Sequence, residues 1–200
     1  MIATIIAFLV LLNPFALFIY LQPVMRELSE KDFHKVLFRA SLISFGIFAL
    51  FVIAGDFIFL RIFQINFEAF RIFGGIIIFT LAYMFIIQGK KSLIDMKENL
   101  DDLAAEIALP FMVGAGTISL CVVMSNKYRT PKGILILSII MILHYIIIFL
   151  LMQIRKLVAA RFRVAFDKNM EIALRLNGLF VGAIGVNMII VGIKNLYLLK

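Results

Sequence analysis

Long apolar runs constrain the fold of this chain more than any other feature. Six stretches of mainly apolar residues each come close to the roughly 20 residues that a helix needs to cross a bilayer. They cover residues 2–25, 36–59, 69–88, 106–124, 133–153 and 172–193. Barrel strands are not expected, because polar and apolar residues do not alternate along these runs. The sequence therefore predicts an all-α membrane protein, a single transmembrane domain over residues 1–200 with six transmembrane helices.

The charged residues lie mainly between the apolar runs and indicate an orientation. Only 16% of the residues are charged, and the net charge is +8. Loops one (Arg26, Lys31, Lys35), three (Lys90, Lys91, Lys97) and five (Arg155, Lys156, Arg161, Arg163, Lys168) together carry eleven basic residues, whereas the other side has Arg61, Lys127, Arg129 and Lys132, with Lys194 and Lys200 in the tail. The positive-inside rule places these loops in the cytoplasm, so both termini are predicted to be extracytoplasmic in a multi-pass plasma-membrane protein. Without a separate basic domain, nucleic-acid binding is not expected.

Loop five, residues 155–170, has two interpretations. It mixes basic side chains with apolar ones such as Leu157, Phe162 and Val164. Such a segment either lies on the inner membrane surface against anionic lipid or forms an ordinary solvated loop.

Two of the apolar runs contain helix breakers near their middle. The first run is interrupted at Asn13-Pro14, and the fourth contains Pro110 and the triplet Gly114-Ala115-Gly116. In hydrocarbon, the backbone groups that such breaks free are tolerated only where protein or a water-filled cavity satisfies them. Because the breaks correspond, the chain divides into halves, 1–100 and 101–200, of three helices each. An odd number of crossings turns the second half over, which predicts an inverted-topology repeat.

The third and sixth runs support this repeat. Arg71 and Gly74 near the start of the third run align with Arg175 and Gly178 near the start of the sixth. We interpret these four residues and Gly75 as a helix-packing motif, because small residues let two membrane helices approach closely.

The interruptions indicate a binding site near the midplane of the membrane. The half-helix after a break begins with free N–H groups and a positive dipole end, which suits a carboxylate or another anion. The candidate substrate-binding residues are Asn13, Pro14, Gly114, Ala115, Gly116, Thr117 and Asn187. Purely structural roles remain open: the prolines as kinks, the glycines as packing residues, and Asn187 in an interhelical hydrogen bond.

One histidine lies deep in a predicted span. His144 is either a proton carrier or a neutral imidazole bonded to a neighbouring helix. No carboxylate lies at the centre of a run, which disfavours a metal or cation pump with buried carboxylate ligands. We expect no metal site, no cofactor and no enzyme activity, because no catalytic constellation or nucleotide-binding context is visible.

The motifs resemble those of the MarC family of integral membrane proteins over nearly the whole chain. Residues 69–76, Ala-Phe-Arg-Ile-Phe-Gly-Gly-Ile, resemble the family's third-helix signature. Residues 175–179 with Gly192 resemble its last helix, where Asn187 stands in place of the usual Gln.

The interrupted segments resemble the family with departures. Asn13-Pro14 resembles the family's Asn-Pro-x-Gly-x-x-Pro start, with Ala16 and Ile19 in place of Gly and Pro. Residues 110–116 resemble its Pro-x-x-x-Gly-Pro-Gly segment, with Ala115 in place of Pro.

The resemblance implies a secondary transporter that moves small neutral amino acids such as glycine or alanine, coupled to protons, by alternating access. Its expected partners are the amino acid, protons and the lipid bilayer. Two alternatives remain: a transporter or exporter of another small solute, drug or metal ion, and a membrane scaffold that transports nothing.

Overall fold

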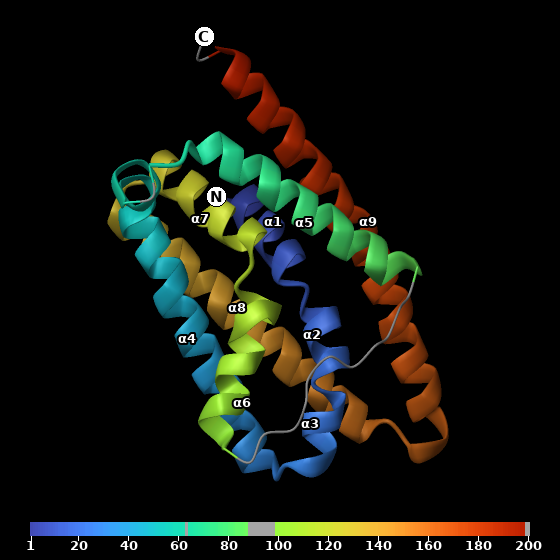
Figure 1. Cartoon of the computed structure of the whole chain (residues 1–200). Coiled ribbons are helices and arrows are strands. Elements are labelled where there is room, and N and C mark those ends of the chain that lie inside the picture. The colour runs from blue at the N-terminus through green and yellow to red at the C-terminus, as the bar shows by residue number, and fades with distance from the viewer. Residues whose placement is uncertain (63, 88–98, 199–200) are drawn as a thin grey trace.

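The computed structural model is helical throughout the residues that it describes, which are 1–62, 64–87 and 99–198 (Figure 1). No strand occurs among these residues. In chain order the elements are α1 (Ile2–Leu12), α2 (Pro14–Tyr20), α3 (Gln22–Glu27), α4 (Glu30–Phe57), the π-helical segment η1 (Ile58–Ile62), α5 (Phe67–Ile87), α6 (Leu100–Glu106), the π-helical segment η2 (Ile107–Met112), α7 (Ala115–Lys127), α8 (Thr130–Leu157) and α9 (Ala160–Leu198).

Five helical segments of the described chain are long and apolar enough to span a membrane: Ile2–Glu27, Glu30–Gly55, Phe67–Ile87, Thr130–Leu157 and Arg161–Tyr197. The remaining predicted span, 106–124, differs because it is divided among α6, η2 and α7. Leu109 leaves helical geometry (φ −120°, ψ 115°), since a following proline disfavours the helical conformation. A second interruption follows at Val113 and Gly114. The chain is therefore a multi-pass membrane protein in which one predicted span is not a continuous helix.

Loop five is much shorter than the sequence suggested. Helix α8 continues to Leu157 and α9 begins at Ala160, so the predicted loop 155–170 is a connection of two residues. The segment contains no Gly or Pro, and its Ala, Arg, Leu and Lys residues favour helix. Loop three, with Lys90, Lys91 and Lys97, lies outside the described residues.

The helices alternate in direction. In Figure 1, α1 to α3 run down, α4 returns upward, α5 descends, α6 to α7 rise, α8 descends and α9 rises. Two hydrogen bonds lie at the upper end of the bundle as drawn in Figure 1: one joins α1 to the residue after α7, and the other joins α9 to α5. Thr4 Oγ1 lies 3.0 Å from Tyr128 OH, and Asn195 Nδ2 donates to Glu68 Oε1 over 3.1 Å. The beginning of α1 and the end of α9 therefore lie on the same side of the bundle.

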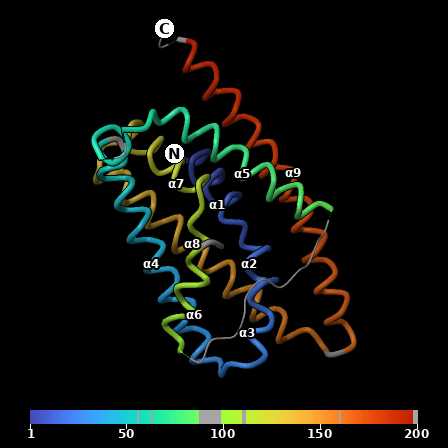
Figure 2. Tube along the Cα trace, in the orientation of Figure 1, coloured from blue at the N-terminus to red at the C-terminus, as the bar shows by residue number. Residues whose placement is uncertain are grey.

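The core has two parts. A large buried cluster joins α1 to α4 with α6 to α8 and includes Phe8, Phe48, Leu103 and Ile140. Helices α5 and α9 lie side by side over most of the length of α5 (Figure 2) and share a smaller cluster. The last turn of α1 packs against that smaller cluster. The interrupted helix α1–α2 thus lies between the two parts.

Candidate functional site

The first interruption is built by Asn13 and Pro14. Asn13 adopts a left-handed conformation (φ 45°, ψ 70°), which asparagine tolerates better than most residues. Its Oδ1 accepts a hydrogen bond of 3.1 Å from the amide of Ala16 and so caps α2. Pro14 occupies the first turn of α2, where an N–H would have no partner within α2. The chain therefore ends one helix and starts another inside the bundle, where Asn13 is only 4% exposed.

The second interruption precedes α7. Gly114 is extended (φ −136°, ψ 171°), and α7 begins at Ala115. The Thr117 hydroxyl accepts a hydrogen bond of 2.9 Å from the Gly114 amide. The same hydroxyl lies 3.2 Å from the Met112 carbonyl oxygen, to which it can donate. Thr117 thus secures the bend, while the first amides of α7 lack partners within the helix.

The last turn of α1 contacts three helices from the second half of the chain. Pro14 has no N–H, so the Val10 carbonyl loses its helical partner. Asn177 Nδ2 of α9 replaces it with a hydrogen bond of 3.1 Å. Leu11 Cδ1 lies 3.6 Å from the place where a Cβ on Gly116 would be. The two interruptions therefore lie close together, joined through consecutive residues of α1.

His144 of α8 faces the same turn. Its imidazole is fully buried and directed toward the Leu12 carbonyl, without reaching hydrogen-bond geometry. In a continuous helix the Leu12 carbonyl would accept a hydrogen bond from the Ala16 amide. Here that amide donates to Asn13 Oδ1 instead. The first interruption thus leaves a carbonyl oxygen directed at the one histidine buried in the described chain.

Three buried side chains around the interruptions have polar atoms without a hydrogen-bond partner among the described residues. These atoms are Asn13 Nδ2, Ser119 Oγ and both ring nitrogens of His144. Ser119 lies one turn beyond Gly116 on α7 and is 1% exposed. Buried polar atoms in folded proteins nearly always have partners, so exceptions need an explanation. The set contains one amide donor, one hydroxyl and one imidazole, which suits a small polar molecule rather than an apolar one.

The structure brings most of the predicted substrate-binding residues to this place. Asn13 and Pro14 form the first interruption, and residues 114–117 form the second. Asn187 is not among them, because its side chain is exposed on α9. The amide of α9 that reaches the interruption is that of Asn177, to which the sequence alone had led us to assign no role. The sequence contained a signal for this contact. Pro14 leaves the Val10 carbonyl without its helical partner, and a buried carbonyl needs a hydrogen-bond donor from elsewhere.

The predicted packing motif lies mainly where α5 and α9 cross. A Cβ on Gly75 would lie 2.6 Å from the Gly185 carbonyl oxygen, and one on Gly178 would lie 3.4 Å from the Ala82 carbonyl oxygen. Gly74 instead faces α7, where a Cβ would lie 3.3 Å from the Ala115 carbonyl oxygen.

The two arginines of the motif differ. Arg71 forms an ion pair of 2.8 Å with Glu68 and lies over the Phe67 ring. Arg175 is exposed. The match between the two runs therefore reflects shared glycine packing more than shared arginine contacts.

Comparisons with known proteins agree with this architecture. The family model described as MarC family integral membrane protein matches residues 1–197. Similar proteins include a UPF0056 membrane protein of Aquifex aeolicus, 26% identical over 96% of this chain and 91% of its own length. Others are the UPF0056 membrane protein PH0214 of Pyrococcus horikoshii (28% identical; 83% and 82% covered) and YvbG of Bacillus subtilis (29% identical; 80% and 77% covered). No solved structure matches the chain.

Proposed function

The chain belongs to the MarC family of integral membrane proteins, and we propose that it is a secondary transporter of small neutral amino acids such as glycine and alanine. The observation that carries this proposal is the set of unpartnered polar atoms of Asn13, Ser119 and His144, buried beside two helix interruptions. Helix breaks that face each other near the midplane are typical of substrate sites in secondary transporters.

The ends of the broken helices suit the two charges of an amino acid. The first amides of α7, at Ala115 and Gly116, offer donors and a positive dipole end to a carboxylate. The carbonyl of Leu12, at the end of α1, offers an acceptor and a negative dipole end to an ammonium group. Because Asn13, Thr117 and Ser119 carry no formal charge, a substrate without net charge fits this site best.

Close packing around the second interruption favours a small substrate. A Cβ on Gly116 would lie 1.9 Å from Ile78 Cδ1, so the space beside this glycine is already filled by α5. Nothing lies within 4 Å of a Cβ placed on Gly114. These contacts close the side of Gly116 and leave space beside Gly114, which supports a substrate with a small side chain.

We assign the proton to His144. An imidazole can accept and release a proton, and that of His144 faces the Leu12 carbonyl of the same interruption. A change in its charge would therefore act directly on the substrate's ammonium group.

The proposal includes alternating access by two inverted halves, residues 1–100 and 101–200. The opposite directions of α1–α3 and α6–α7 support this symmetry, as do the equal lengths of α4 and α8, 28 residues each (Figure 1). We place the ends of α3 and α8 in the cytoplasm of a plasma-membrane protein, with both termini outside, because the basic residues gather at those ends.

The test is uptake and counterflow of labelled glycine and alanine by the purified protein in liposomes, with and without an imposed proton gradient. A panel of larger amino acids, drugs and divalent cations serves as competitors. Competition by glycine and alanine alone supports the proposal. If neither amino acid flows or competes, it is wrong, and flux of another panel member identifies a different transporter.

A matched pair of serine variants tests the site itself. Ser119→Ala removes the unpartnered hydroxyl and is expected to lower uptake roughly three- to ten-fold, as the loss of one hydrogen bond to substrate implies. Ser125→Ala on the same helix removes a hydroxyl that already donates to the Val122 carbonyl over 2.8 Å, and should leave uptake unchanged. Equal uptake by the two variants would place the substrate elsewhere.

A further inference from the structure

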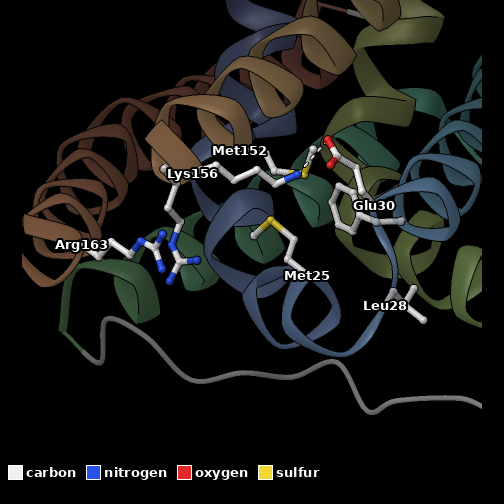
Figure 3. Close-up of a pocket in the computed structure, with 8 residues that line it drawn as sticks. Met25, Leu28, Glu30, Met152, Lys156 and Arg163 are labelled. Carbon is white, nitrogen blue, oxygen red and sulfur yellow. Dashed lines mark ion pairs between the residues drawn. The ribbon is translucent and has the colours of Figure 1, made fainter. Parts of the chain in front are cut away.

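A separate pocket lies at the end of the bundle where α3, α4, α8 and α9 meet. Its volume is about 250 Å³. Three basic side chains line it: Arg155 and Lys156 from the end of α8, and Arg163 from the beginning of α9. Figure 3 shows Lys156 and Arg163 entering from different helices, with Glu30 paired to Lys156. Glu30 pairs with Lys156 and Asp167, outside the lining, pairs with Arg155, so these three cations and two carboxylates leave one net positive charge, that of Arg163.

Each cation keeps hydrogen-bond donors after its protein contacts are counted. Arg155 uses Nε and Nη2 on Asp167, at 2.8 and 3.0 Å, and Nη1 remains. Lys156 contacts Glu30 over 2.8 Å and has two further N–H groups. Arg163 donates only from Nε, to the Val158 carbonyl, and has no acidic partner in the described part of the chain. The free donors of both arginines suit the oxygens of a phosphate group.

The remaining lining and the adjacent surface are apolar. Met25, Phe33 and Met152 line the pocket and are partly or fully buried. Beside it, Leu157 is 85% exposed and Val164 is 76% exposed, although both lie at a helix end with basic neighbours. Exposed apolar side chains next to cations are typical of segments that lie in the membrane interface. A ligand with both an anionic group and an apolar body fits these surroundings better than a soluble anion does.

We propose that this pocket binds the phosphate of an anionic phospholipid, held by Arg163 with Arg155 and Lys156. The glycerol and upper acyl chains would lie along Met25 and Met152. The bound lipid would join the ends of α3, α8 and α9 at the membrane surface. This inference is independent of the transported substrate, because the pocket contains none of the residues at the helix interruptions.

The experiment is native mass spectrometry of the detergent-purified protein titrated with phosphatidylglycerol or phosphatidylcholine, and with inorganic phosphate as a competitor. We expect phosphatidylglycerol to bind in preference to phosphatidylcholine. Arg163→Gln should weaken its binding about five-fold, the change that corresponds to about 1 kcal/mol for one cation near an anionic headgroup. The matched control is Arg161→Gln, because Arg161 is exposed on the same helix and lies over the Phe162 ring, outside the pocket.

Each other outcome overturns the proposal. Equal binding of both lipids would show that the headgroup charge is not recognised. Equal weakening by both arginine variants would indicate general surface attraction rather than this pocket. Displacement of the lipid by inorganic phosphate at matched concentrations would identify a site for soluble phosphate. Because Arg163 is exposed, its variant should fold, and unchanged melting of the variant checks this.

Discussion

Replacing Gly75 with alanine should push α5 and α9 apart at the point where their backbones cross. The added Cβ would lie 2.6 Å from the Gly185 carbonyl oxygen and 2.8 Å from Ile189 Cγ1. Ordinary contact begins at 3.4 Å, so the helices must separate by about 0.8 Å. Overpacking of this kind costs about 1–3 kcal/mol when, as here, a backbone atom cannot rotate away.

Gly46→Ala provides the matched control. Nothing lies within 4 Å of a Cβ placed on Gly46, which is exposed in the middle of α4. Both substitutions gain about 1 kcal/mol of helix propensity, so their difference isolates the clash. We expect Gly75→Ala to melt roughly 2 to 12 °C below Gly46→Ala, from 2–4 °C per kcal/mol for a chain of this size.

The chain contains a convenient reporter for this measurement. Its single cysteine, Cys121 on α7, is fully buried. A thiol-reactive fluorogenic dye therefore labels the protein only as it unfolds, and the midpoint of labelling on heating gives the melting temperature. Equal midpoints for the two alanine variants would refute the close crossing of α5 and α9 at Gly75 and Gly185.

Four further substitutions test the interruptions. Asn177→Leu should lower the free energy of unfolding by about 1–3 kcal/mol, because it leaves the Val10 carbonyl without a hydrogen-bond donor. The same dye assay measures this change, and an unchanged midpoint would contradict the role of Asn177. Asn13→Ala should cost about 1–2 kcal/mol, since it removes the cap on the Ala16 amide. Asn13→Gly should lower the free energy of unfolding by only about a few tenths of a kcal/mol, because glycine accepts the left-handed conformation. Uptake should still fall, because the side-chain amide is lost. A stable variant with normal uptake would exclude Asn13 from the site. His144→Gln should make amino acid uptake independent of an imposed pH gradient, and coupling equal to that of the wild type would remove His144 from the mechanism.

The sequence was most informative where structure follows from local chemistry. Long apolar runs require helices in lipid, and the described chain is helical and multi-pass as predicted. Pro14 has no N–H to donate to the Val10 carbonyl, so the dipeptide Asn13-Pro14 was enough to predict the first interruption. The segment 155–170 was the local feature that we misjudged, because its charges suggested a loop although it has no helix breaker.

The sequence by itself determined which backbone groups would be left unpaired, because that depends on proline, glycine and hydrogen bonds between near neighbours. Only the tertiary structure decided what meets those groups. Asn177 reaches Val10 across 167 positions of the chain, and His144 faces Leu12 from another helix. Asn187 lies on the same helix as Asn177 but faces outward. These contacts depend on how the helices cross and rotate against one another, and packing of the whole bundle sets that geometry.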